Sequence, residues 1–246
     1  MTKGYIHKEV FKIRAREIGA DNKLSLPALI EIMQEASFKH AIGLKASFWD
    51  MQKEKLSWVV LKKELEIIRH ADANEEIEVH TYPSEYDKLF ATRDFYVYDT
   101  AGKIIAKARS LWTLINTETR KMEHIPEWMA SLIPEDIDTP LGKPDVKIRH
   151  KFPYTQLVNY KINYLDIDWN NHTNNNIINR QILMSTPPEI LKNKKPKVFK
   201  IFYRSESLLG HDITIESTDL HEDLVYYKVH NLVTDKVIAL ASCAFE

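Results

Sequence analysis

An internal repeat limits the possible folds of this chain more than any other feature of its sequence. Placing Asp21 on Asp168 pairs REIGADNKLSLPALIEIMQEA with NYLDIDWNNHTNNNIINRQIL. Placing Lys103 on Lys236 pairs KIIAKARSLW with KVIALASCAF and keeps the small residues in register. Two matches in the same order indicate a duplicated unit whose second copy is shorter between the two matches.

The first copy begins with a strand pattern and a long helix. Phe11 and Ile13 alternate with polar residues, as in a half-buried strand. Ser25 is a suitable N-cap, Pro27 falls in the first turn, and apolar residues recur at helical spacing until Gly43. The apolar stripe is broad, so we expect this helix to pack against a large surface.

Strand patterns follow the helix. Alternating or β-branched runs cover 58–68, 76–82, 90–98 and 103–116, and Asp-Thr-Ala-Gly separates the last two. This tetrapeptide between two alternating runs is a hairpin signal. One helix followed by a meander of strands predicts an antiparallel sheet curled over a helix.

The repeat divides the chain into two halves and a connection. Periodicity disappears over 119–149, where prolines punctuate the sequence. We therefore expect an N-terminal domain over 1–118, an inter-domain linker over 119–150 and a C-terminal domain over 151–246. The expected fold class is α+β, with a long helix wrapped by an antiparallel β-sheet in each half.

Composition argues against several classes of function. A net charge of −1 gives no basic footprint for nucleic acid. No apolar run approaches the roughly 20 residues that span a membrane, and the N-terminal residues lack the apolar core of a signal peptide. The single cysteine, Cys243, excludes an intrachain disulfide and a zinc cluster built on cysteines. We therefore expect a cytoplasmic protein that binds neither nucleic acid nor membrane and uses no metal or cofactor.

A polar cluster before the second helix carries the candidate chemistry. The segment LDIDWNNHTNNN covers 165–176, and in it Asp168, Asn170 and His172 follow one another at a spacing of two. An extended backbone would point these three side chains to the same side. The alternative is a solvated loop, with Asn171 as a formal glycosylation acceptor. The expected cytoplasmic location argues against glycosylation.

Several segments together carry a resemblance to a known family: DIDWNNHTNNN at 166–176, FYRSES at 202–207, WVV at 58–60, ARSLWTLINTETRKMEHIP at 108–126 and the first-half stretch REIGADNKLSLPALIEIMQEA. The specific part is D-x-N-x-H-x-N-N, followed further along the chain by Y-R-x-E. Over its whole length the chain resembles the acyl-ACP thioesterases of plants and bacteria. The resemblance implies a tandem double hotdog fold and hydrolysis of fatty acyl thioesters in fatty acid biosynthesis.

The resemblance also implies a catalytic constellation of Asp168, Asn170, His172 and Glu206. These residue types suit thioester hydrolysis, which needs an activated water and a stabiliser for the carbonyl oxygen as it becomes negative. Either the imidazole or the Glu206 carboxylate can be the immediate base. The amide of Asn170 can donate to the oxygen, while Asp168 can hold its neighbours in place. Plant members typically have cysteine where this chain has Ser207, so a cysteine nucleophile at that position is excluded.

The two halves are expected to divide the work. Opposite Asn170 and His172 the first copy has Lys23 and Ser25, so it lacks the amide and the imidazole. We therefore expect the C-terminal half to hydrolyse the thioester and the N-terminal half to bind the acyl chain. The residues expected to line that pocket are Met33, Trp58 and Val60. The alternative is that they form core.

The resemblance implies acyl carrier protein as the partner that delivers the acyl chain. Acyl carrier protein is acidic, and the lysines of LKNKKPKVFK at 191–200 would attract it, unless they form an ordinary solvated loop. Three other readings stay open: an acyl-CoA thioesterase, a hotdog dehydratase and a lipid-binding module without activity. Either a monomer or a homodimer is compatible with the sequence.

Overall fold

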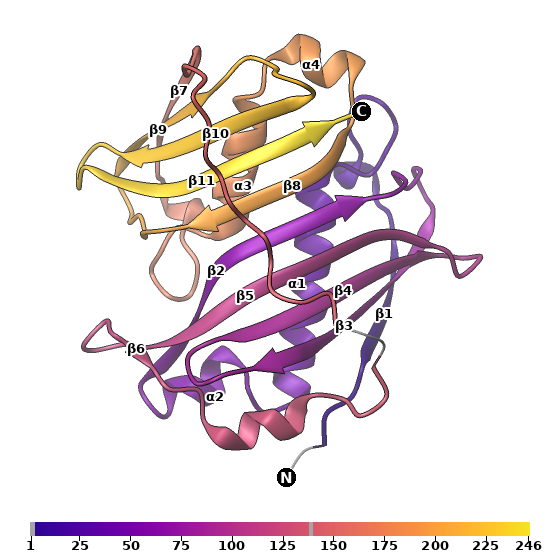
Figure 1. The fold of residues 1–246 in the computed structure, drawn as a ribbon, viewed down its shortest axis with the longest axis vertical. Coiled ribbons are helices and arrows are strands. Elements are labelled where there is room, and N and C mark those ends of the chain that lie inside the picture. The colour runs from indigo at the N-terminus through magenta and orange to yellow at the C-terminus, as the bar shows by residue number, and fades with distance from the viewer. Residues whose placement is uncertain (1–2, 138–139) are drawn as a thin grey trace. The chain divides into compact units, whose positions relative to one another are not determined.

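The computed structural model describes residues 3–137 and 140–246. These form two compact units, Met1–Asp145 and Val146–Glu246. Each unit has one antiparallel sheet and one principal helix (Figure 1). The expected α+β class, with a helix wrapped by an antiparallel sheet in each half, is confirmed.

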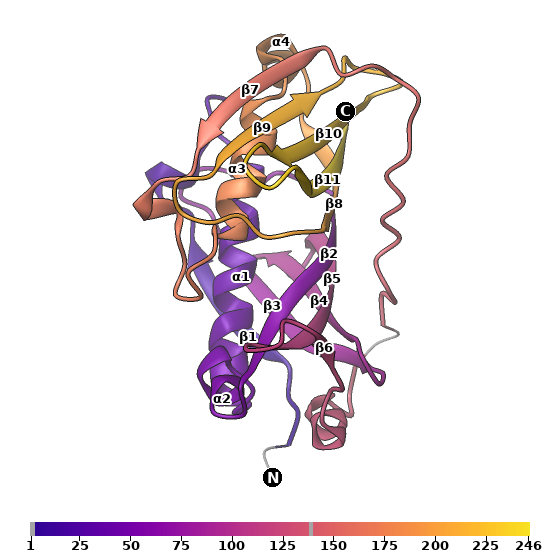
Figure 2. The ribbon, with the colours of Figure 1, turned by 90° about the vertical axis from the view of Figure 1, so that its left-hand side faces the viewer.

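The first unit has a sheet in the order β1-β3-β4-β5-β2, with β6 paired to β5. Its strands are β1 His7–Lys12, β2 Leu56–Ile67, β3 Glu76–Tyr86, β4 Ala91–Asp99, β5 Ile104–Asn116 and β6 Met122–Glu123. Its helices are α1 Leu26–Gly43 and the short α2 Phe48–Gln52. Figure 2 shows α1 along one face of this sheet, where it contacts β1 and β3.

Helix α1 has the ends that the sequence predicts. The Ser25 hydroxyl accepts a hydrogen bond from the Ala28 amide at 3.4 Å, and Pro27 lies in the first turn, where it removes no helical hydrogen bond. The helix ends at Gly43. Its buried residues include Leu29, Ile30, Ile32, Met33 and Ala36. The broad apolar face is therefore packed, as expected.

The second unit repeats this arrangement with a shorter helix. Its sheet has the order β8-β11-β10-β9-β7. The strands are β7 Gln156–Lys161, β8 Pro196–Tyr203, β9 Asp212–Ser217, β10 Leu224–Asn231 and β11 Lys236–Phe245. Helix α3 covers only Asn175–Met184, and α4 Pro188–Asn193 begins at the second of the two prolines that follow it.

The structure corrects the register of the repeat before the helices. A bridge joins Ile18 to Leu24 in the first unit and Ile167 to Thr173 in the second, so Ile18 corresponds to Ile167. Strands β1 and β7 begin and end in the same register. Asp21 therefore corresponds to Asn170 and not to Asp168. The sequence comparison was wrong here because it aligned two aspartates that occupy different positions of the same turn.

The register near the C-terminus of each unit agrees with the sequence comparison. Placing Lys103 on Lys236 puts Ile105 on Ile238. Both carbonyls accept two backbone hydrogen bonds, Ile105 from 68 and 69 and Ile238 from 204 and 205. This part of the predicted repeat is confirmed.

Residues 119–150, expected to connect the two halves, include part of the core of the first unit. The short 3-10 helix Glu127–Leu132 buries Met129 and Leu132 in a cluster with Ile125. Further on, the Leu141 amide donates to Asp94 at 2.9 Å. Positions 138–139 of this stretch lie outside the described residues. The prolines interrupt long helices and strands, but short turns still bury apolar side chains.

Candidate active site

The polar segment before α3 is a tight hairpin turn. The Asp168 amide donates to the His172 carbonyl at 2.9 Å, and the Asn171 amide donates to the Asp168 carbonyl at 3.0 Å. Asn171 has a φ of 60°, in the left-handed region that asparagine tolerates better than most residues. The expected extended backbone over 168–172 is therefore wrong. A spacing of two does not by itself place these three side chains on one side.

Asp168 organises this turn through the backbone. Its carboxylate accepts hydrogen bonds from the amides of Asn170 at 2.8 Å and of His172 at 3.3 Å. Such an Asx contact is a common way for aspartate to fix a turn. These main-chain contacts agree with the holding role expected for Asp168, which stays a prediction. Asn170, half-buried, lies in the same turn.

His172 and Glu206 meet, although they lie on segments far apart in the sequence. The Nε2 atom of His172 lies 3.1 Å from a carboxylate oxygen of Glu206. The His172 side chain is 21% exposed and that of Glu206 is 41% exposed, so the pair is accessible to a substrate. An imidazole in contact with a carboxylate can accept a proton from water while the carboxylate holds the ring.

The start of α3 supports the hairpin from the other side. Asn174 is the N-cap of α3, and its side chain accepts from the Asn176 amide at 2.9 Å. Asp166, which was not expected among the site residues, is 5% exposed and accepts hydrogen bonds from the Tyr160 hydroxyl and the Asn163 amide. Its signal was an acid three residues after an asparagine, which is a capping-box spacing.

The equivalent turn of the first unit carries different chemistry. With the corrected register, Asp21 and Lys23 take the places of Asn170 and His172. His70 takes the place of Glu206, because the Leu24 amide donates to Ala71 as the Thr173 amide donates to Ser207. At the positions of Asn170 and His172 the first half therefore lacks the amide and the imidazole, as expected, but the residues there are Asp21 and Lys23.

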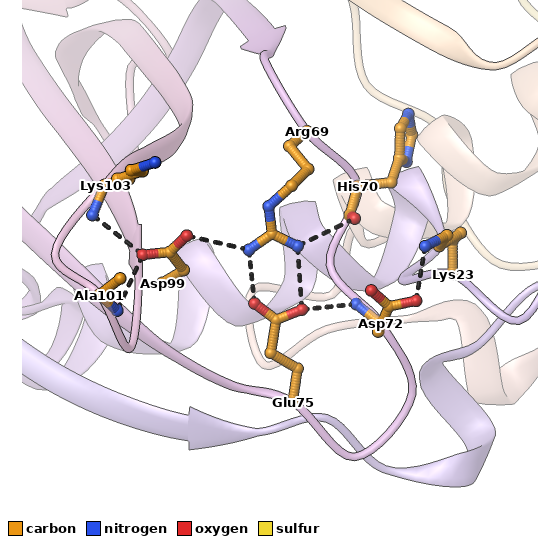
Figure 3. A network of polar contacts seen from close by, with 8 residues as sticks. All are labelled: Lys23, Arg69, His70, Asp72, Glu75, Asp99, Ala101 and Lys103. Carbon is orange, nitrogen blue, oxygen red and sulfur yellow. Dashed lines mark hydrogen bonds and ion pairs between the residues drawn. The ribbon is translucent and has the colours of Figure 1, made fainter.

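Ion pairs surround this place in the first unit. Lys23 pairs with Asp72 at 2.5 Å. Arg69 binds Glu75 and Asp99, and Figure 3 shows these contacts. Lys23 takes the place of His172, and Arg69 and Asp72 lie close in sequence on either side of His70, which takes the place of Glu206.

Two other sets of residues have contacts that agree with ordinary structural roles. Met33 and Val60 are buried in the first unit, and the Trp58 indole packs against a core cluster and donates to the Ala46 carbonyl at 3.0 Å. In the second unit, Lys194 pairs with Asp223 and Lys197 pairs with Glu246.

Cys243 is fully buried, and burial raises the pKa of its thiol well above the usual range. It is therefore a core residue and not a nucleophile. Over 3–137 and 140–246, no group of three or more His, Cys, Asp or Glu side chains is placed to hold a metal ion. Nor does any helix within these two ranges have the length and apolar character to cross a membrane.

Comparison with known proteins agrees with both units. The model of the acyl-ACP thioesterase N-terminal domain matches residues 4–133, and that of the acyl-ACP thioesterase C-terminal domain matches 149–246. The chain is 30% identical over 227 residues to a chloroplastic palmitoyl-acyl carrier protein thioesterase of Cuphea hookeriana, covering 87% of this chain and 54% of that protein. It is 26% identical to the chloroplastic oleoyl-acyl carrier protein thioesterase 2 of Arabidopsis thaliana, covering 84% of this chain and 61% of that protein. The chain thus spans about half the length of the curated relatives it matches.

Solved structures share the fold. The 12:0-ACP thioesterase from Umbellularia californica superimposes with a TM-score of 0.89 at 23% identity, covering 100% of this chain and 99% of that one. An acyl-ACP thioesterase from Bacteroides thetaiotaomicron gives a TM-score of 0.84 at 22% identity, covering 98% of each chain. Together with the two domain models, which match nearly the whole chain, these findings show that the protein belongs to the acyl-ACP thioesterase family.

Proposed function

We propose that this protein hydrolyses a fatty acyl thioester carried by acyl carrier protein, releasing a free fatty acid and the carrier thiol. The observation that carries the proposal is the contact of 3.1 Å between His172 and Glu206. It lies in the unit matched by the C-terminal domain model of the family. The names of the relatives support the carrier and the acyl substrate.

The residues of the turn supply what the reaction needs. The His172 and Glu206 pair removes a proton from water, whose oxygen then bonds to the carbonyl carbon. The side-chain amide of Asn170 donates to the carbonyl oxygen as it becomes negative. The carbon-sulfur bond then breaks, and the proton taken from water is returned to the sulfur as the thiol leaves. Asp168 contributes by fixing the turn that carries Asn170 and His172.

The acyl chain is assigned to the first unit as part of the same proposal. Helix α1 has a broad apolar face, whereas α3 is shorter and more polar. Met33, Trp58 and Val60 are the proposed pocket residues. Substituting Met33 or Val60 with a larger apolar residue should shift the preferred chain length of the substrate. A loss of stability with an unchanged chain-length preference would mean that both residues are core residues and do not line the pocket.

The cytoplasmic location, the monomeric or dimeric state and the docking of the carrier on lysines 192–200 stay predictions. The relatives named above are chloroplastic proteins. Pairing of Lys194 and Lys197 with acidic residues reduces the charge that this segment offers to an acidic partner.

The test is release of free thiol from a panel of acyl-carrier substrates, with the native chain and His172→Ala compared side by side. We expect the native chain to release thiol and the variant to lose roughly 10²-fold or more of that rate. The matched control is Lys23→Ala, which changes the equivalent position of the first unit and should keep the rate. The rates with acyl-CoA and with acyl-carrier-protein substrates are compared to decide between the two carriers. A higher rate with acyl-CoA would favour an acyl-CoA thioesterase. Thiol release that is equal in native and His172→Ala protein would refute the assignment.

A further inference from the structure

We propose that Thr173 and Ser207 are positioning residues that hold His172 against Glu206. Each of them directly follows one member of the pair in the sequence. Thr173 is 7% exposed and Ser207 is 2% exposed, so we expect neither side chain to contact the substrate directly. The inference rests on the proposed function, because it explains how that catalytic pair is kept together.

Three hydrogen bonds join the two residues. The Thr173 amide and the Thr173 hydroxyl both donate to the Ser207 carbonyl, each at 2.9 Å. The Ser207 hydroxyl donates to the Thr173 hydroxyl at 2.8 Å. We call this arrangement the hydroxyl clasp. It ties together two backbone segments that lie 34 residues apart, at the point where each presents its catalytic side chain.

The first unit provides an internal control for this arrangement. At the equivalent place the Leu24 amide donates to the Ala71 carbonyl at 2.9 Å, the same distance as the bond from Thr173 to Ser207. Leucine and alanine have no hydroxyl, so the side-chain part of the clasp is missing there. The backbone bond alone is thus sufficient for the hairpin and its neighbour to pair. The two added hydroxyls occur in the unit that carries the imidazole and the carboxylate.

The clasp has a physical effect on the pair. Glu206 is exposed and lies in the segment between β8 and β9, outside any strand or helix. Buried hydrogen bonds immediately beside it restrict the backbone motion that would carry the carboxylate away from His172. Correct placement matters because a misplacement of about 1 Å can cost ~10²-fold in rate. Loss of the clasp should therefore lower kcat and leave substrate binding nearly unchanged.

The decisive variant is Thr173→Val combined with Ser207→Ala. It removes both hydroxyls together, so no buried hydroxyl loses its partner. Only the hydrogen bond from the backbone amide of residue 173 to the carbonyl of residue 207 is left, as in the first unit. We expect kcat to fall by roughly 10-fold and KM to stay within about twofold, since a positioning effect is smaller than loss of the chemical group itself. Thr173→Ser, which retains the hydroxyl, should keep the native kcat. Thermal unfolding of each variant shows whether the fold is kept.

Three outcomes would overturn the proposal: native kcat in the double variant, a fall in activity that only follows a loss of folded protein, or the same loss in Thr173→Ser as in the double variant. Nuclear magnetic resonance of the His172 ring gives a readout that needs no enzymatic activity. The ring signals should respond to Glu206→Gln in the native background and respond much less in the double variant. If the native chain releases no thiol but this coupling is seen, the proposed function fails while the clasp stands. If thiol is released but the ring responds to Glu206→Gln equally in the native and double-variant backgrounds, the positioning role of the clasp is refuted while the proposed function stands.

Discussion

The two units share one backbone plan and differ in what they place on it. Each has a strand, a short 3-10 helix, a hairpin turn with asparagine in the left-handed region and a capped helix. In the first unit the turn carries Lys23 and leads into an apolar helix of 18 residues. In the second it carries His172 and leads into a helix of 10 residues whose buried face includes Asn179 and Gln181. Backbone hydrogen bonds therefore determine this turn, while the side chains on it are free to diverge.

The interiors diverge as well. In the first unit, His40 of α1 is fully buried, and its Nδ1 lies 3.0 Å from the guanidinium of Arg93. The shorter α3 ends at Met184, before the position that would correspond to this histidine. In the second unit the buried Asn179 accepts a hydrogen bond from the Tyr203 hydroxyl at 2.7 Å. The principal helix of the first unit thus buries a titratable ring, whereas that of the second buries neutral amides at other positions.

The largest effect that would separate the two units comes from changing Glu206 and its counterpart. Glu206→Gln should lower kcat/KM for an acyl-carrier substrate by roughly 10² to 10⁴-fold, because the ring loses its carboxylate partner. His70→Gln, at the equivalent place in the first unit, should leave the rate within about twofold. Steady-state kinetics on both variants measures the difference. Similar losses in the two would show that the units do not divide the work as proposed.

The second test concerns acid stability, which the first unit should control through His40. Burial, together with the positive charge of Arg93 and the nearby His7, lowers the pKa of His40 to about 2. Below the unfolded pKa of about 6.5 the unfolded chain binds a proton that the native ring does not, so stability falls as pH falls. The free energy of unfolding should fall by an amount that approaches ~1.4 kcal/mol per pH unit as the pH is lowered from about 6 to the acid limit of the fold.

Denaturant unfolding at pH 7, 6 and 5 measures this slope, and His40→Asn is the matched variant. Asparagine keeps an acceptor near the position of Nδ1 but cannot take up a proton, so the slope should decrease. His150 in the second unit also has a lowered pKa, mainly through burial, and contributes in the same direction. An unchanged slope in His40→Asn would show that other groups cause the acid sensitivity, such as His150 or the ion-paired Glu17 and Glu75, whose pKa values are also lowered.

The smallest expected effect concerns the ion pairs of the first unit in Figure 3. Arg69→Gln breaks the contacts to Glu75 and Asp99, but the Arg69 side chain is 40% exposed, so solvent already weakens them. The free energy of unfolding should fall by no more than about 1 kcal/mol, with activity unchanged. A large loss of activity would mean that this network supports the site, contrary to the division of work between the units.

Much of the architecture could be predicted from the sequence because local rules decided it. Ser25 and Gly43 mark the ends of α1, and the turn at Asp99 joins β4 to β5, with Gly102 at a φ of 75°. The duplication was visible because small and apolar residues recur in order. The residues of the candidate site were found through the motif and its resemblance, while the expected extended geometry was wrong.

Local patterns were sufficient for the two helices, most strands, the duplication and the identity of the polar residues on the second turn, since these depend on neighbours in the chain. Folding in three dimensions set the register that places Ile18 on Ile167, the packing of 127–132 into the first unit, and the contact between His172 and Glu206. That contact depends on hydrogen bonds between segments that no local pattern relates. A turn and an extended strand also share the same spacing of polar residues, so only the folded backbone distinguishes them.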